Sequence, residues 1–347
     1  MSSVLGEMPG FTVPWNEPSR VPLPRHLYLH VPLCRSKCAY CSFYSTADDG
    51  RVAHADLVRA TLDSLAEWIA PGVRPVPLET LYVGGGTPTV LGDALADLVR
   101  NTTTLLPLAP GAEVTVEANP ESLTPGLLAV LADAGVTRVS IGVQALDDAA
   151  LAFLGRCHDR REALAALSAA VESGLDVSAD LMAGVPGVSP EGWCRALQEI
   201  VDAGVRHVSV YPLTIEPGTP MAEAIAAGRA PVPDEDATVD AMEAAAAMLA
   251  EQGLARYEVA NYAVPGHESR HNTAYWTGWP YLAIGGGAQG MLSGDQARAL
   301  GLVPEGETDV ARVRYGYAAD PYPMRAAQPL ATFETMSAAE AFREDAM

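Results

Sequence analysis

Residues 26–41 read HLYLHVPLCRSKCAYC, an apolar run that is followed at once by three cysteines. The run over 26–33 is short, apolar and bounded, and it predicts a buried strand. Pro32 prevents a helix from continuing out of that strand. On one continuous helix the cysteines would be spread over roughly 10 Å, too far for a compact metal centre. We therefore expect a loop that carries Cys34, Cys38 and Cys41.

Runs of the same kind recur along the chain and alternate with longer Ala- and Leu-rich segments of helical period. The predicted strands cover 26–33, 79–85, 113–118, 138–144, 176–184 and 207–215. The predicted helices cover roughly 54–70, 91–105, 124–135, 161–173, 190–203 and 235–254. This alternation is typical of parallel βα units joined by helical crossovers. We predict an α/β fold, a partial (β/α)6 TIM-like barrel with a small appended C-terminal subdomain.

The alternation stops after residue 255, which suggests three regions. We predict an N-terminal extension over 1–25, a barrel core over 26–255 and an appended C-terminal region over 256–347. The last region contains a strand-like YEVANYA, a glycine-rich GGGAQG, and a final AAEAFREDAM that predicts a helix.

Several predicted strands end in residues that are poor strand formers but can approach a ligand closely. The C-terminal strand ends of a barrel build its active site, so these residues are expected to converge. One such end alone would indicate only a turn. The candidate positions are Gly84–Thr87, Glu117–Pro120, Gln144 and Gly184–Gly187.

Composition narrows the classes of partner and compartment. The 43 acidic and 22 basic side chains give a net charge of −21, which repels nucleic acid backbones and anionic membrane surfaces. Five cysteines, an odd number, argue against a secreted disulfide scaffold. Residues 1–25 lack the pattern of a signal peptide, and no long uncharged apolar run follows. We expect a cytoplasmic protein that neither spans a membrane nor binds nucleic acid.

Three soft thiolates on one loop favour an iron–sulfur cluster, zinc or copper(I). A structural zinc site normally takes four ligands. The two other cysteines, Cys157 and Cys194, are predicted on helices as packing residues. The spacing alone leaves three alternatives: a cluster with one open iron, a zinc site, or unligated thiols.

The CxxxCxxC pattern at 34–41 together with GGGTPT at 84–89 resembles the radical S-adenosylmethionine (SAM) superfamily. The resemblance implies a [4Fe-4S] cluster on Cys34, Cys38 and Cys41, with SAM on the fourth iron. Electron transfer would then cleave SAM and give a 5′-deoxyadenosyl radical. Glycines without side chains would let the backbone approach the methionine part of SAM. By the same resemblance, SAM would be contacted by Tyr28, Tyr40, Gly85, Gly86, Thr87, Glu117, Gln144, Arg156 and Asp180.

Further segments, among them RVSIGVQALDD, LGRCHDR and DLMAGVPG, resemble the oxygen-independent coproporphyrinogen III oxidase-like branch, and its haem chaperones in particular. Phe43 stands where the oxidase type has a fourth cysteine. The stretch HNTAYW at 271–276 matches an HNxxYW motif, which implies haem as cargo and His271 as a haem contact. A structural role for His271 is an open alternative. The sequence departs from the pattern of this branch at two places. Gln289 stands where histidine is usual. The sequence ends at Met347, where relatives continue, which fits either a short protein or a fragment.

The resemblance implies a haem chaperone that carries a cluster and SAM and delivers haem to a haem-dependent client, such as a membrane-associated protein. Such a client would need a surface that complements the acidic chain. The alternative is an active radical SAM enzyme of the same branch, either coproporphyrinogen III oxidase/dehydrogenase-like or a methyltransferase. A third possibility is a degenerate barrel without the cluster. The sequence assigns no catalytic residue.

Overall fold

The computed structural model describes residues 21–69, 74–303, 306–322 and 330–345. The chain divides into two compact units. Unit 1 contains Met1–Leu33, Asp49–Val114 and Arg270–Met347, and unit 2 contains Cys34–Asp48 and Thr115–Ser269. The first twenty residues of the predicted N-terminal extension lie outside the described ranges.

Unit 1 contains a mixed sheet with the strand order β14-β13-β12-β11-β1-β4. The central strand β1 is parallel to both β4 and β11, and β11 to β14 pair antiparallel. Its strands are β1 (His26–Val31), β4 (Leu78–Gly85), β11 (Tyr281–Ile284), β12 (Gln289–Ser293), β13 (Arg312–Tyr317) and β14 (Leu330–Met336). Its helices are α1 (His54–Ile69), η2 (Pro88–Leu91), α2 (Asp93–Leu105), α9 (Arg270–Trp276), α10 (Gly294–Ala299) and α11 (Ala338–Asp345).

Unit 2 contains the strand order β5-β6-β7-β8-β10-β9, with parallel pairing from β5 to β8. The strand β5 (Leu108–Ala118) begins in unit 1 and ends in unit 2. The other strands are β6 (Arg138–Gln144), β7 (Asp176–Ala183), β8 (His207–Pro212), β9 (Ala255–Arg256) and β10 (Asn261–Ala263). Two short strands, β2 (Leu33–Cys34) and β3 (Thr46–Ala47), pair separately. The helices are η3 (Pro120–Ser122), α3 (Pro125–Asp133), α4 (Asp148–Leu154), α5 (Arg160–Glu172), α6 (Pro190–Asp202), α7 (Pro220–Ala226) and α8 (Glu235–Glu251).

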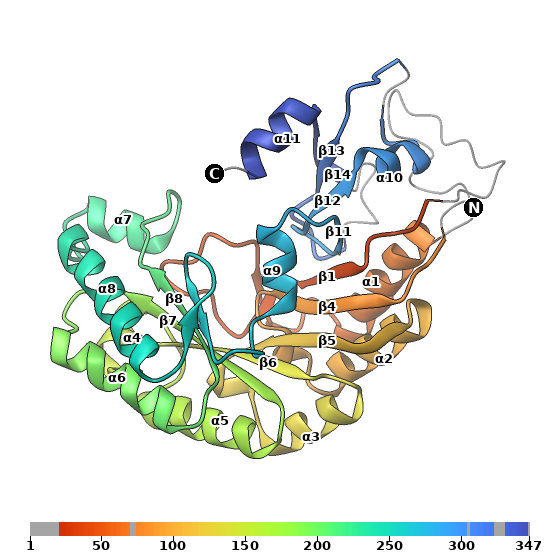
Figure 1. The fold of residues 1–347 in the computed structure, drawn as a ribbon. Helices are drawn as coiled ribbons and strands as arrows, with labels where there is room; N and C mark the ends of the chain where they lie inside the picture. The colour runs from red at the N-terminus through yellow and green to blue at the C-terminus, as the bar shows by residue number, and fades with distance from the viewer. Residues whose placement is uncertain (1–20, 70–73, 304–305, 323–329, 346–347) are drawn as a thin grey trace. The chain divides into compact units, whose positions relative to one another are not determined.

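Alternation along the strands of unit 2 explains its layers. In β6, the apolar Val139, Ile141 and Val143 alternate with Ser140 and Gly142, and the side chains of a strand point alternately to opposite faces. Helices α5, α6 and α8 lie on one side of β6, β7 and β8 (Figure 1), where the apolar side chains are buried. The opposite face is therefore polar, unlike that of most buried parallel sheets.

Local signals set the helix boundaries. Asp159 and Glu162 form a capping box at the start of α5, and Ser189 caps α6 ahead of Pro190. All six predicted strands are present, although β5 begins earlier and β8 ends earlier than predicted. No helix in the described ranges is long and apolar enough to cross a bilayer.

Region 256–347 adds strand β11 beside β1 in parallel. The predicted boundary at residue 255 falls within unit 2, which continues to Ser269, and the chain returns to unit 1 at Arg270. The predicted three-region division stays a prediction.

Candidate functional site

The three cysteines lie in the segment Cys34–Asp48 of unit 2, and each is half-buried. Cys34 ends β2, and its carbonyl accepts the Asp48 N–H at 2.8 Å, which closes the segment. The Cys41 N–H donates to the Cys38 carbonyl at 3.3 Å. Cys38 and Cys41 belong to no helix, so the predicted loop is confirmed.

The connection between α4 and α5 holds this loop from residues far along the chain. The Ala39 N–H donates to the Leu154 carbonyl at 3.0 Å, and Arg156 Nη1 lies 3.3 Å from Cys38 Sγ. Gly155 has φ +72°, and a Cβ there would lie 3.0 Å from the Ala39 nitrogen. A glycine is needed both for this conformation and for the close approach.

The interpretation of Cys157 as a helical packing residue is wrong. Gly155 ends α4 in the left-handed conformation and Asp159 caps α5, so Cys157 lies between the two helices. Its side chain is exposed, and Sγ lies 2.8 Å from Ser36 Oγ in the cysteine loop. Cys194, by contrast, is half-buried on α6 as predicted.

Arg156 joins the cysteine loop to the ends of two strands. Its Nη2 donates to Asn119 Oδ1 at 2.6 Å, after β5, and to the Gly142 carbonyl at 2.7 Å, on β6. Burial alone would lower the pKa of Arg156, but Cys38, Tyr40 and Glu121 together raise it. A Cβ at Gly142 would lie 2.9 Å from Asn119 Oδ1 and 2.9 Å from Gln144 Nε2, so a larger residue would displace these side-chain ends.

The polar face of unit 2 carries a part-buried carboxyl. Asp180 accepts hydrogen bonds from Ser140 Oγ at 3.2 and 3.1 Å, and burial raises the pKa of Asp180 although Ser209 and Ser140 act against the rise. Strand register places Asp180 beside Gly142 and Ser209, and Ser209 beside Asn261. Burial is the main cause that raises the pKa of the Tyr211 phenol. The charge of Asp180 raises it further, and Glu117 adds a smaller contribution. The predicted contact residues Glu117 and Asp180 are thus near neighbours of one phenol.

The cysteine loop offers the donor set that an iron–sulfur cluster uses. Burial raises the pKa of the Cys41 thiol, the Phe43 N–H lowers it, and Cys38 and Cys34 raise it further, so the three sulfurs are close enough to interact. Burial also raises the pKa of Tyr40, which keeps this phenol neutral beside Cys38 and Cys41. No three His, Cys, Asp or Glu side chains in the described ranges surround a single point as one metal ion would require. A [4Fe-4S] cluster would bind the three thiolates at separate irons.

Two buried polar atoms next to the loop have no hydrogen-bond partner. They are Gln144 Oε1 and Arg156 Nε, and Ser45 Oγ within the loop is a third such atom. Gln144 also has φ +64°, a conformation uncommon outside glycine. Buried polar groups are nearly always paired, so these two atoms fit a site completed by a bound polar ligand.

Four of the predicted SAM contacts lie in unit 1, not unit 2. The hydroxyl of Tyr28, on β1, forms a hydrogen bond with Nδ1 of His30 at 2.9 Å. Gly85 has φ +114°, and a Cβ there would lie 2.6 Å from the His30 ring. The Gly86 and Thr87 N–H groups donate to the Val31 and Leu33 carbonyls at 2.9 and 2.6 Å. These two amides pair with backbone carbonyls, so a SAM contact at Gly86 or Thr87 would use their other atoms, and the predicted contacts stay predictions.

His271 is fully buried in unit 1, with 0% of its surface exposed. Its Nδ1 lies 2.6 Å from Thr80 Oγ1, and its Nε2 lies 2.8 Å from the Tyr275 hydroxyl. Burial and then His26 lower the pKa of His271 to about 3. The Glu113 carboxylate accepts the His271 N–H at 3.0 Å and anchors the start of α9. Both ring nitrogens are therefore engaged within the protein.

Sequence reasoning missed several residues of these networks. Asn119, one of the predicted strand-end positions, accepts a hydrogen bond from Arg156. The residues missed are Ser36 of the cysteine loop, which contacts Cys157, and Ser140, Ser209 and Asn261 on the polar face. The signal for the last three was the polar residue at every second strand position. Sequence reasoning also gave no sign that Trp276 and Trp279 are 64% and 58% exposed.

Comparisons with known proteins place these features in a family context. A family model described as the radical SAM superfamily matches residues 28–200. The heme chaperone HemW of Mycobacterium tuberculosis is 40% identical over 282 residues, which cover 79% of this chain and 72% of that protein. The heme chaperone HemW of Escherichia coli is 39% identical over 280 residues, which cover 80% and 72%.

A solved structure shows the same fold. Coproporphyrinogen III oxidase (HemN) from Escherichia coli, described as a radical SAM enzyme, superposes with a TM-score of 0.74. The match covers 99% of this chain and 76% of that chain at 18% identity. The prediction of an α/β, partial TIM-like barrel is thereby confirmed.

Proposed function

The chain belongs to the HemW family of the radical SAM superfamily, and on that premise we propose that it is a haem chaperone that carries a [4Fe-4S] cluster and SAM. The observation that carries the proposal is the cysteine loop, which three contacts from residues 154–157 hold in place. This degree of local definition suits a site that must present three thiolates together.

The cluster would be held by Cys34, Cys38 and Cys41, with the Arg156 guanidinium compensating thiolate charge at Cys38. Bound together, the cluster and SAM supply one-electron cleavage of a sulfonium carbon–sulfur bond. The contacts implied by the family resemblance would bind and orient SAM. In unit 2 these are Tyr40, Glu117, Gln144, Arg156 and Asp180, and in unit 1 Tyr28, Gly85, Gly86 and Thr87.

For haem, the geometry of α9 supports a surface contact more directly than a bond from His271 to the iron. Trp276 and Trp279 expose most of their indole area, and flat apolar rings pack well on such faces. Ligation of iron by His271 would require Tyr275 to release Nε2 and the buried ring to become accessible. His271 would therefore act as a haem ligand only in a conformation in which its Nε2 is released and its ring is exposed.

Delivery of haem would take place in the cytoplasm, to a haem-dependent client that is membrane-associated or soluble. The net charge of −21 requires a client with a basic docking surface or a small local contact.

Haem titration of the cluster-loaded chain tests the proposal. We expect one equivalent of haem to bind and little 5′-deoxyadenosine to form with dithionite and SAM. Trp276→Ala should weaken haem binding, whereas Val239→Ala, which shortens an exposed apolar side chain on α8 of unit 2, should not. If His271→Ala weakens binding while the haem absorption spectrum is unchanged, His271 supports α9. If the spectrum loses a histidine-ligand signature, His271 ligates iron. An absence of haem binding would reject the chaperone role.

The polar face of unit 2 favours a second candidate, an active radical SAM enzyme. Asp180, Ser140 and Ser209 form a part-buried hydrogen-bonding row that a substrate or SAM could use. The fold shared with a coproporphyrinogen oxidase fits the same reading, although fold alone does not assign function. Decarboxylation of coproporphyrinogen III, or formation of S-adenosylhomocysteine with a methylated product, would establish the enzyme.

A further inference from the structure

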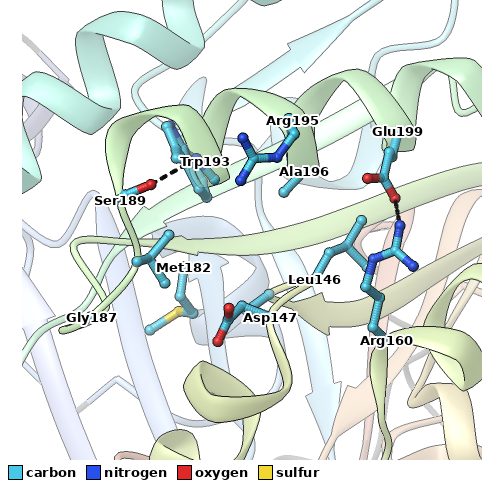
Figure 2. Close-up of a pocket in the computed structure, with 13 residues that line it drawn as sticks. Leu146, Asp147, Arg160, Met182, Gly187, Ser189, Trp193, Arg195, Ala196 and Glu199 are labelled. Carbon is cyan, nitrogen blue, oxygen red and sulfur yellow. Dashed lines mark hydrogen bonds and ion pairs between the residues drawn. The ribbon is translucent and has the colours of Figure 1, made fainter.

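Unit 2 contains a cavity of about 340 Å³ that none of the proposed cluster, SAM or haem contacts lines. It lies between the segment that follows β6, the segment that follows β7, and helix α6 (Figure 2). Its volume is near the lower end of the range for small-molecule sites, roughly 300–1,000 Å³. The residues that matter to its chemistry are Asp147, Arg160, Met182, Trp193, Arg195 and Glu199.

Two opposite charges face this cavity from different sides. Figure 2 shows the Arg195 guanidinium on one side and the Asp147 carboxylate on the other. Arg160 is paired with Glu199, so these two charges are already compensated. Among the described residues Arg195 forms no direct ion pair, and its electrostatic partner is the exposed Glu191 one turn earlier on α6. Asp147 uses Oδ1 for the Ala150 N–H at 2.8 Å.

Apolar side chains line part of the cavity beside the two charges. Met182 is 8% exposed and Trp193 is 5% exposed, and both contribute to the lining. The Trp193 Nε1–H donates to the Ala241 carbonyl at 2.8 Å, which fixes the indole ring. A ligand that enters therefore contacts the apolar side chains of Met182 and Trp193. It also meets the Arg195 guanidinium on one side and the Asp147 carboxylate on the other.

We infer that this cavity binds a small zwitterion, an α-amino acid with an apolar side chain. Arg195 takes the carboxylate, Asp147 takes the ammonium group through its remaining oxygen, and Met182 and Trp193 contact the side chain. Inorganic phosphate would satisfy only Arg195 and would be repelled by Asp147. A neutral apolar molecule would leave both charges uncompensated as water is displaced.

The floor of the cavity connects it to the cysteine loop within unit 2. Ala145 and Met182 line the cavity and also belong to the buried cluster against which Ala39 and Tyr40 pack. Tight packing transmits small displacements between neighbours. Occupancy is therefore expected to change the surroundings of Cys38 and Cys41, which flank Tyr40.

Calorimetric titration of the full chain tests this inference, with L-leucine and L-methionine as probes at up to about 10 mM. We expect both amino acids to bind and to be weakened about tenfold or more by N-acetylation or amidation, each of which removes one charge. Arg195→Gln and Asp147→Asn should each weaken binding about tenfold. Asn keeps the helix cap that Asp147 provides, so α4 should stay folded.

The matched control is Arg161→Gln, because Arg161 is an exposed arginine of α5 that does not line the cavity. It should leave binding unchanged. No heat from either amino acid with the wild-type chain, or equal affinity in both cavity variants and the wild type, would overturn the inference. Because haem is absent from the experiment, its outcome is independent of the chaperone proposal.

Discussion

Replacing Arg156 by alanine removes a side chain that contacts Cys38, Asn119 after β5 and Gly142 on β6. Asn119 Oδ1 and the Gly142 carbonyl lose donors at 2.6 and 2.7 Å. Hydrogen bonds to charged groups contribute about 1.5–3 kcal/mol each, and the lower value applies because Arg156 is partly exposed. Two such bonds give a loss of about 3 kcal/mol in the free energy of unfolding. The chain also loses the cation beside Cys38, so thiolate charge there becomes less favourable.

Two measurements on Arg156→Ala check this reasoning. Urea denaturation of the chain without metal should show the loss of about 3 kcal/mol. Anaerobic reconstitution should give less iron and sulfide per chain than the wild type. Arg156→Lys keeps the charge but loses the planar guanidinium that bonds to two groups at once. Its stability and iron content should lie between those of the wild type and of Arg156→Ala. Arg161→Ala, an exposed control, should behave as the wild type. Unchanged stability together with full iron content in Arg156→Ala would refute the role assigned to Arg156.

Three further predictions concern other contacts. Gly155→Ala should lower the free energy of unfolding by about 1–2 kcal/mol because of its φ of +72°, and it should lower iron content because the new Cβ meets Ala39. Gly174→Ala is the control. Gly174 has φ +81° and open space around it, so this variant should lose a similar free energy of unfolding and keep the wild-type iron content. The pKa values of His207 and His271 are lowered to about 3, so the unfolded chain binds more protons than the folded chain below pH 6.5. The free energy of unfolding should then fall by about 2 kcal/mol per histidine between pH 6.5 and 5, and a flat pH profile from urea titrations would contradict this. Asp180→Asn should weaken SAM binding about tenfold in equilibrium dialysis, since a neutral amide replaces the acceptor that Ser140 and Ser209 hold; unchanged affinity would remove Asp180 from the SAM site.

Local patterns in the sequence predicted most of the barrel. Strands β6 and β7 appear where apolar and β-branched residues predicted them, because their outward faces are buried beneath helices. The regions missed were short or polar. β11 has only four residues, and β13 contains two arginines in RVRYGY, so neither resembles a buried strand in isolation. Pairing with β1 and within the antiparallel part of unit 1 stabilises them.

The candidate site divides in the same way. The spacing of Cys34, Cys38 and Cys41 predicted a loop with a metal-binding donor set, which depends on neighbouring residues only. The contact of Arg156 with Cys38 joins residues 118 positions apart, and the Cys157–Ser36 contact joins residues 121 positions apart. Local periodicity carries no information about such contacts. The burial of His271 on α9 was equally hidden, because it depends on Thr80 of β4 and Glu113 of β5.

Electron paramagnetic resonance of the reduced, reconstituted chain, before and after addition of SAM, tests the central claim most directly. A cluster held by Cys34, Cys38 and Cys41 leaves one iron open, so we predict about four irons and four sulfides per chain and a spectrum that shifts when SAM is added. Cys38→Ser should lose the signal, whereas Cys194→Ser, on α6, should keep it. A chain that takes up no cluster, or a cluster whose spectrum is indifferent to SAM, would contradict the account.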